Sequence, residues 1–250
     1  MLKRLFIFFT IILIGAIIVW NFKANNKSNT QTQIQIPTPT PTPVIASPIE
    51  VKLIDFEIPN KKINFSYPQV SSGLSEEQMI KFNDFASQSA EIIYNTEKSE
   101  LPENWTGDTT VERADTKIIS AIISITVMPE GAVHPVHFSS VINYSINQSK
   151  SLTIQDIFEE KSDYLNKLSD LVKEKLTQGY KDEGNWDEGF QSFLDDGARA
   201  DAKSFQKFVM GKDYLTFIFD PYQAGPYAYG TRLAKVSFEE LRGLLKPDIL

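Results

Sequence analysis

Cysteine is absent from this 250-residue sequence, and histidine occurs only twice. The absence of cysteine excludes disulfides, thiolate nucleophiles, cysteine-based zinc sites and the lipid-modified cysteine of a lipoprotein. With two imidazoles, a metal site would need mainly carboxylate ligands, so only hard cations such as Ca²⁺ or Mg²⁺ would suit it. The sequence also lacks a phosphate-binding Gly-rich loop, a Gly-x-Ser-x-Gly elbow and a His-Glu-x-x-His zinc motif. We therefore expect no metal and no other cofactor, and we name no catalytic residue.

Positive charge is scarce, with 25 Lys and Arg against 32 Asp and Glu and a net charge of −7. The charged residues of the first 48 positions are all basic, namely Lys3, Arg4, Lys23 and Lys27, and subtracting these four charges from −7 leaves −11 for residues 49–250. A domain this acidic repels nucleic acid and anionic lipid surfaces. The charge either favours a basic partner or only keeps the domain soluble.

The single long apolar run spans residues 5–22 and follows two basic residues. Its length of about 24 to 27 Å as a helix, at about 1.5 Å per residue, is slightly short of a bilayer core but can be accommodated. A cleaved signal peptide is the alternative, but Phe22 would then occupy a position that requires a small residue. We predict that residues 1–23 are a transmembrane signal anchor in the cell membrane. The positive-inside rule favours a single-pass orientation with the C-terminal domain extracytoplasmic.

Residues 24–48 contain almost nothing to bury, and prolines alternate with threonines from Pro37 to Pro43. Alternating prolines favour an extended polyproline conformation, which predicts a semi-rigid linker.

Residues 49–250 predict an α+β fold with a mixed, mostly antiparallel sheet or sheets and two main helices. Two strands are expected over residues 51–58 and 62–67, the second stopped by Pro68. A helix should begin at Ser75, because Gln78 three residues later completes a capping box. Its apolar residues fall on one face at 3.6-residue spacing, namely Met79, Phe82, Ala86, Ala90 and Ile93. Further strands are expected over residues 118–127, 137–146, 205–210, 214–219 and 233–238. The strands 205–210 and 214–219 should form a hairpin around Gly211, and 214–219, which is apolar on both faces, should be an interior strand. A second helix should be capped by Ser162 and end near Gly179, and a short helix should start from Ser237, where Glu240 completes another capping box. We divide the chain into an N-terminal α+β subdomain, residues 49–130, and a C-terminal one, residues 131–250.

Three segments resemble a known family. Residues 214–230, Tyr-Leu-Thr-Phe-Ile-Phe-Asp-Pro-Tyr-Gln-Ala-Gly-Pro-Tyr-Ala-Tyr-Gly, resemble the strand and loop of the domain of unknown function 3298, although that family more often has Ala in place of Gly225. Residues 131–135 and 152–158 are similar to its Gly-Gly-Ala-His-Pro turn and its Leu-Thr-Leu-Asp-Asp-Leu-Phe segment. The part from Phe65 through the first helix resembles the smaller domain that usually precedes it. The resemblance covers residues 51–247 and makes the C-terminal subdomain RsiV-like.

The resemblance implies a function, because this domain occurs in RsiV-type lysozyme-sensing anti-sigma factors and, as a non-catalytic accessory module, in PdaC-type peptidoglycan deacetylases. We expect a non-enzymatic, membrane-anchored binding or sensing module of the bacterial cell envelope, with a basic protein such as lysozyme or a cell-wall glycan as ligand. The alternative is a peptidoglycan-modifying enzyme that uses carboxylate or Ser chemistry.

Two segments supply candidate ligand-binding residues. Three tyrosines lie on a loop bounded by prolines and Gly230, where rigid aromatic side chains suit either recognition or packing at the end of a sheet. An acid-rich stretch around Trp186 reads as a solvated loop or as a docking surface for a basic partner, since its spacing does not fit a calcium loop. The candidates are Tyr222, Tyr227, Tyr229, Trp186, Asp182, Glu183, Asp187 and Glu188. His134 and His137 flank a proline turn, and we interpret them as hydrogen-bonded turn residues and not as metal ligands.

Overall fold

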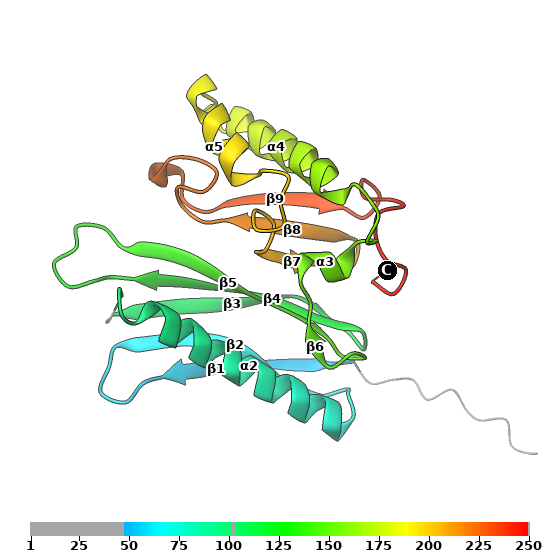
Figure 1. Ribbon diagram of the computed structural model, residues 1–250. Coiled ribbons are helices and arrows are strands. Elements are labelled where there is room, and N and C mark those ends of the chain that lie inside the picture. The colour runs from blue at the N-terminus through cyan, green and yellow to red at the C-terminus, as the bar shows by residue number, and fades with distance from the viewer. Residues whose placement is uncertain (1–47, 102–103, 250) are drawn as a thin grey trace, which may run out of the picture. The chain divides into compact units, whose positions relative to one another are not determined.

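The computed structural model describes residues 48–101 and 104–249 (Figure 1). The predicted anchor, residues 1–23, and nearly all of the predicted linker lie outside this range. Among the described residues, no helix has the length and apolarity needed to cross a bilayer.

A six-stranded sheet comes first, and its strands follow one another in chain order. Neighbouring strands are antiparallel except for a parallel pair, β2 and β3. The strands are β1 Glu50–Glu57, β2 Ile63–Ser72, β3 Trp105–Ala114, β4 Ile118–Val127, β5 Val136–Ser145 and β6 Lys150–Ser151. The predicted stop at Pro68 is wrong, because β2 continues through this residue opposite Leu53 of the edge strand β1. Strand β3 was not predicted, since its alternation of polar and small residues resembles a loop.

Helix α2, Glu76–Glu97, makes the crossover between the parallel strands and covers one face of this sheet (Figure 1). Its capping box is confirmed, with the hydroxyl of Ser75 accepting from the backbone N–H of Gln78 and the Gln78 amide oxygen accepting from the backbone N–H of Ser75. The predicted apolar stripe forms the first core together with the inward-facing residues of the strands, such as Phe65 and Trp105. The buried residues of the stripe are Phe82, Ala86, Ala90 and Ile93.

The second sheet has three antiparallel strands in the order β7 Phe208–Met210, β8 Tyr214–Phe219 and β9 Arg232–Ser237, so β8 is the interior strand as predicted. Helix α4, Tyr164–Asp182, packs on this sheet and encloses the second core (Figure 1). Shorter helices are α3 Ile154–Ile157, η1 Glu188–Phe190, α5 Gln191–Gly197 and η2 Tyr227–Tyr229.

Two helix boundaries differ from the prediction. Asp163 and not Ser162 precedes α4, because the Ser162 hydroxyl donates to the carbonyl oxygen of Glu159 in the preceding turn, at 2.7 Å. The helix also runs past Gly179. After Ser237 the predicted capping-box hydrogen bonds with Glu240 are present, but they close a series of turns and no helix follows.

Polar side chains join the two sheets. The Ser120 hydroxyl on β4 accepts from the N–H of Met210 at 2.7 Å and donates to the amide oxygen of Asn143 at 2.6 Å. The Asn143 amide in turn donates to the carbonyl oxygen of Phe208 at 2.6 Å. Side chains on the face of the first sheet therefore supply hydrogen-bond partners for backbone groups at the edge of β7. The predicted subdomain boundary at 130/131 falls in the turn between β4 and β5, and the chain leaves the first sheet only after Ser151.

Candidate functional site

The loop of residues 220–231, which connects β8 to β9, begins with a residue that is bonded to both sheets. One carboxylate oxygen of Asp220 accepts from the backbone N–H of Ser139 on β5, at 3.0 Å. The other oxygen accepts from the ammonium group of Lys207. Asp220 therefore fixes the base of the loop against the free edge of β5. The sequence motif contained Asp220, but sequence reasoning gave it no role, because its partners lie on distant segments.

Two further contacts hold the middle of the loop, which we call the tyrosine loop. The hydroxyl of Tyr180, a buried residue of α4, donates to the carbonyl oxygen of Ala224 at 2.9 Å. The hydroxyl of Tyr227 donates to the carbonyl oxygen of Pro135 in the β4–β5 turn. Figure 1 shows this turn and the tyrosine loop on the same side of the molecule. The loop is thus held by α4, by β5 and by the turn of residues 128–135.

The structure separates the three predicted tyrosines. Tyr222 is 67% exposed, and its ring centroid lies 5.5 Å from that of the half-buried Tyr227. Its φ of 72° is uncommon for a bulky residue and has an energetic cost that surrounding contacts must offset. Tyr229 instead points inward, with its ring edge-to-face against Tyr180 and Phe190. Tyr222 and the half-buried Tyr227 therefore form an aromatic pair at the surface, and the half-buried Tyr229 packs against the core.

Part of the acid-rich stretch is already paired within the molecule. Glu183 accepts two hydrogen bonds from the guanidinium of Arg232, at 3.0 and 2.8 Å, and this hydrogen bonding lowers the pKa of Glu183. The guanidinium carbon of Arg232 also lies 4.3 Å from the ring centroid of Tyr180. Burial raises the pKa of Tyr180. Glu183 thus holds Arg232 over the aromatic cluster.

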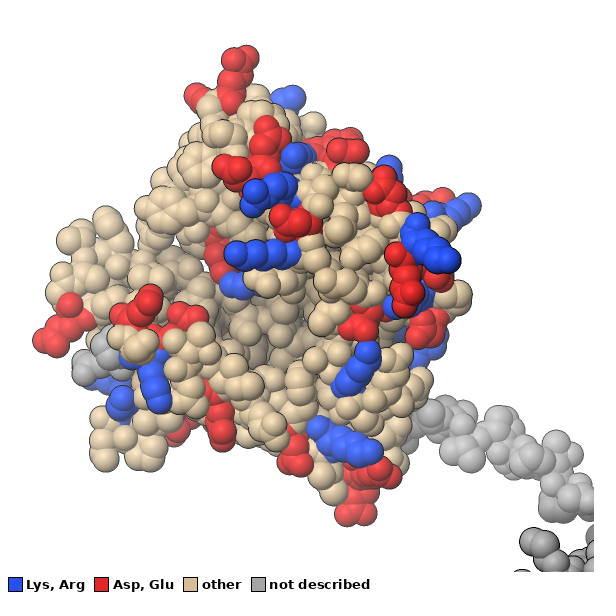
Figure 2. All heavy atoms as spheres, viewed as in Figure 1, with Lys and Arg blue, Asp and Glu red and all other residues tan. Residues whose placement is uncertain are grey.

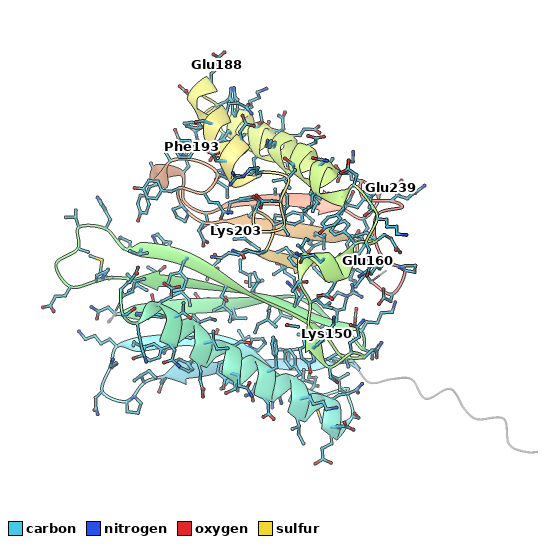
Figure 3. All side chains as sticks on the ribbon, viewed as in Figure 1. Lys150, Glu160, Glu188, Phe193, Lys203 and Glu239 are labelled. Carbon is cyan, nitrogen blue, oxygen red and sulfur yellow. The ribbon has the colours of Figure 1, made fainter. Side chains whose placement is uncertain are left out.

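The other predicted acids differ in their availability. Asp187 caps η1 by accepting from the N–H of Gly189 at 2.6 Å, and Asp182 accepts from the amide of Gln178 at 2.6 Å. Figure 3 shows Glu188 at the tip of the helical layer, pointing away from the rest of the molecule. Figure 2 shows acidic and basic side chains interspersed over this part of the surface. The stretch is less negative as a surface than its composition suggests.

Trp186 is half-buried and packs against the second core. Its ring centroid lies 6.5 Å from that of Phe190, and the ammonium of Lys181 lies 5.7 Å from the Trp186 ring centroid. Phe190 therefore contacts both Trp186 and Tyr229, whereas Tyr222 is paired with Tyr227.

The two histidines do not converge with acids. His134 is exposed on the β4–β5 turn, and Nδ1 of His137 lies 3.0 Å from the Thr126 hydroxyl. Within residues 48–101 and 104–249, no cluster of three or more His, Asp or Glu residues has a geometry that could hold a metal ion.

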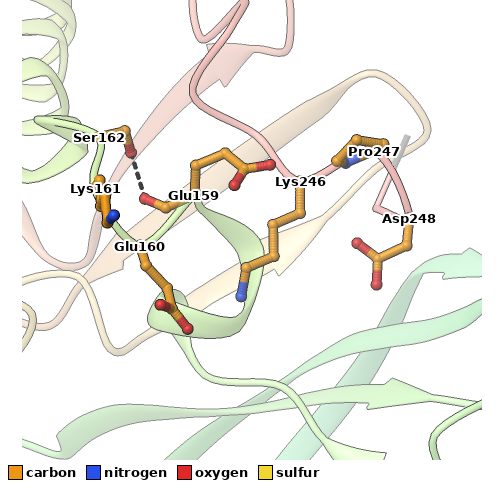
Figure 4. A pocket seen from close by; sticks show the side chains of 7 residues that line it. All are labelled: Glu159, Glu160, Lys161, Ser162, Lys246, Pro247 and Asp248. Atoms are coloured by element: carbon orange, nitrogen blue, oxygen red, sulfur yellow. Dashed lines mark hydrogen bonds between the residues drawn. The ribbon is translucent and has the colours of Figure 1, made fainter.

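A hollow of about 640 Å³ lies between the start of α4 and the C-terminal turn (Figure 4). Its rim carries charges of both signs, including Glu160, Lys161 and Asp248, which are all exposed. Water already solvates these groups, so a ligand would gain little from them. This hollow is a weak candidate for a site.

Comparison with known proteins defines the class of the C-terminal part. Residues 155–239 match the family described as "Protein of unknown function (DUF3298)", so the chain contains a DUF3298 domain and this prediction is confirmed. Over 120 residues the chain is 29% identical to the Peptidoglycan-N-acetylmuramic acid deacetylase PdaC of Bacillus subtilis (strain 168). The match covers 48% of this chain and 25% of PdaC, so the chain corresponds to about a quarter of that relative's length.

Two crystal structures share the fold. A DUF3298 family protein from Pseudomonas aeruginosa PAO1 aligns with a TM-score of 0.58 and 15% identity, over 82% of this chain and 98% of that protein. A member of the same family from Bacteroides fragilis NCTC 9343 aligns with a TM-score of 0.54 and 15% identity, over 80% and 94%. At this identity the comparison establishes the fold alone.

Proposed function

We propose that the chain is a non-enzymatic binding module of the bacterial cell envelope, anchored by residues 1–23, with residues 49–250 outside the cytoplasm. The observation that carries the proposal is the tyrosine loop. It presents Tyr222 exposed, with a φ of 72°, next to a second tyrosine and on a base fixed by Asp220. An aromatic pair held at the surface by fixed contacts supplies contact area at a small entropic cost, which is typical of a recognition surface.

Two ligand classes fit this surface. A basic wall-degrading protein such as lysozyme would be attracted by the excess acid of residues 49–250, with the tyrosines as contact residues. A wall glycan is supported by the likeness to PdaC, whose name refers to peptidoglycan. The same likeness favours the alternative, a peptidoglycan-modifying enzyme, although it extends over only 25% of PdaC.

The test measures binding of the full-length chain, purified in a mild detergent, to lysozyme and to purified peptidoglycan sacculi. We expect binding to at least one of them, and we expect Tyr222→Ala to weaken it by about 2 kcal/mol, or about thirtyfold. The matched control is Ile92→Ala, a comparably exposed residue on α2, which should leave binding unchanged.

Absence of binding to both probes would overturn the proposal. So would acetate or muropeptide release from the sacculi that a single Asp or Ser substitution abolishes, because that result establishes the enzyme.

A further inference from the structure

The second sheet covers only part of the face of the first sheet that lies opposite α2. At one end of β4 this face is buried, because Ser120 bonds to the short strand β7. Towards the other end, Ser124 is exposed, and Ile122 and Thr126 are half-buried. Strand β7 crosses the face at Ser120 and Asn143, which lie directly opposite each other on β4 and β5, so the positions further along β4 lie beyond this crossing.

Strand register places polar side chains in rows across the uncovered part. In one row, Thr106 of β3 lies opposite Asn64 of β2 and Thr126 of β4, and Thr126 lies opposite His137 of β5. In the next row, Ser124 of β4 lies opposite Asp108 on one side and Ser139 on the other. The rows cross up to four strands, which at about 4.8 Å per strand spacing gives a length of about 14 Å.

Two adjoining hollows follow these rows, with volumes of about 420 and 380 Å³, and Ser124 and Thr126 line both. The first hollow continues under the end of the tyrosine loop, where Thr231 and the exposed Leu233 complete its wall. Figure 2 shows a recess between the projecting β4–β5 turn and the upper part of the molecule. We call this combined feature the sheet groove.

The chemistry of the sheet groove restricts its ligand. Among the described residues that line it there is no Lys or Arg, and Asp108 is the one acid. A polyanion such as nucleic acid or a polyphosphate would find no countercharge there. A peptide strand would need the open edge of a sheet, because it binds by pairing its backbone with an edge strand. The groove instead lies on the face of strands whose backbone groups are already paired with their neighbours. Asp220 also occupies the edge of β5 at Ser139, so the groove does not suit a peptide strand.

An uncharged sugar polymer fits the lining best. Hydroxyl and amide side chains in rows can exchange hydrogen bonds with sugar hydroxyls and acetamido groups, while Ile122 and Leu233 can contact the apolar faces of the rings. We propose that the sheet groove binds an uncharged strand of N-acetylated amino sugars. This inference rests on the proposed function, binding at the cell envelope, and specifies a site and a ligand class for it.

The experiment titrates the full-length chain with a linear hexamer of N-acetylglucosamine, followed by calorimetry. We expect saturable binding that Ser124→Tyr abolishes, because the larger side chain fills the space shared by both hollows. The matched control is Ser71→Tyr, the same change at an exposed position of β2 outside the groove, with affinity expected within about twofold of the unmodified chain. If Ser124→Tyr fails to fold, Thr106→Tyr, at an exposed groove position on β3, replaces it.

Two further measurements sharpen the result. Asp108→Asn should leave the affinity for the uncharged hexamer within about twofold, because no ionic contact is lost. The hexamer with its acetyl groups removed should bind more weakly if the acetamido groups carry the recognition. No binding of the N-acetylated hexamer at millimolar concentration, or equal binding by Ser124→Tyr, overturns the assignment. Binding of sacculi that depends on Tyr222 but not on Ser124 would overturn the groove alone and leave the proposed function standing.

Discussion

Replacing Gly225 by Ala should distort the tyrosine loop, because Gly225 leaves space for a buried hydroxyl. A Cβ at this position would lie 1.9 Å from the hydroxyl oxygen of Tyr180 and 3.0 Å from its ring carbon Cζ. Tyr180 cannot move away easily, since it is fully buried and its hydroxyl bonds to Ala224. Such overpacking costs about 1 to 3 kcal/mol. The Tyr180 hydroxyl therefore accounts for glycine at position 225 in this chain.

A double-mutant cycle isolates this contact. Tyr180→Phe alone should cost about 1 to 3 kcal/mol, because it leaves the carbonyl oxygen of Ala224 without its donor. The double variant removes the atom with which the new methyl collides, so Gly225→Ala should cost about 1 to 2 kcal/mol less when Tyr180→Phe is already present. The assay is denaturant unfolding of the three variants and the unmodified chain, analysed at constant m-value.

The matched control is Gly179→Ala in α4, whose Cβ would meet only a side-chain nitrogen of Arg232, at 3.5 Å. This change should stabilise the protein by up to about 1 kcal/mol, since Ala favours a helix more than Gly does. Strict additivity of the Gly225 and Tyr180 substitutions, or a Gly225→Ala variant as stable as the unmodified chain, would refute the steric argument.

Four further predictions concern stability, charge and location. Ser120→Ala should lower the free energy of unfolding in denaturant by about 2 to 4 kcal/mol, because it leaves the Met210 N–H and the Asn143 amide oxygen without partners. The control is Ser71→Ala at an exposed position, and a smaller loss for Ser120→Ala than for this control would contradict the role of Ser120 in joining the sheets. Hydrogen bonds from Lys175 and the backbone N–H of Ser237 lower the pKa of Glu240 from its usual 4.5 to about 2, so its contribution to stability is present above pH 4.5 and is lost as the pH falls towards 2. The Glu240→Gln variant should therefore show a flatter dependence of the unfolding free energy on pH in this window, and an unchanged slope would count against the pairing. If lysozyme binds, the double variant Asp182→Asn with Glu188→Gln should lower the association rate constant at low salt by less than about tenfold and leave the dissociation rate constant nearly unchanged. A stopped-flow or surface-binding measurement in which only the dissociation rate constant changes would exclude electrostatic steering. The full chain should sediment with membranes, and protease added to spheroplasts should remove residues 49–250; recovery of a shortened chain in the secreted fraction would show that residues 1–23 are a cleaved signal peptide.

Local sequence patterns were enough for the elements whose stabilising contacts are themselves local. The capping box at Ser75 and Gln78 satisfies backbone donors within one turn, and the apolar spacing along α2 depends only on helix geometry. The hairpin of β7 and β8 likewise follows from two apolar runs around Gly211. The quoted motifs also identified the DUF3298 domain, which the match to residues 155–239 confirms.

Other features depend on partners that are distant in sequence. Strand β3 has little apolar alternation and forms because β2 and β4 pair with it on both sides, and β2 passes through Pro68 because its neighbour is the edge strand β1. The chain's composition could not show that Glu183 is paired with Arg232, or that Tyr229 packs against the core while Tyr222 stays exposed.

The sequence by itself determined the composition of the candidate surfaces, and tertiary structure decided which of their residues are free to bind. Asp220 becomes a fixed point only when β5 and Lys207 approach it from separate segments. The sheet groove exists because β7 crosses the face of β4 at Ser120, so the same alternation of Ser, Thr and Ile is buried at Ser120 and exposed at Ser124. Strand periodicity assigns a side chain to a face, but what covers that face is set by the packing of other elements.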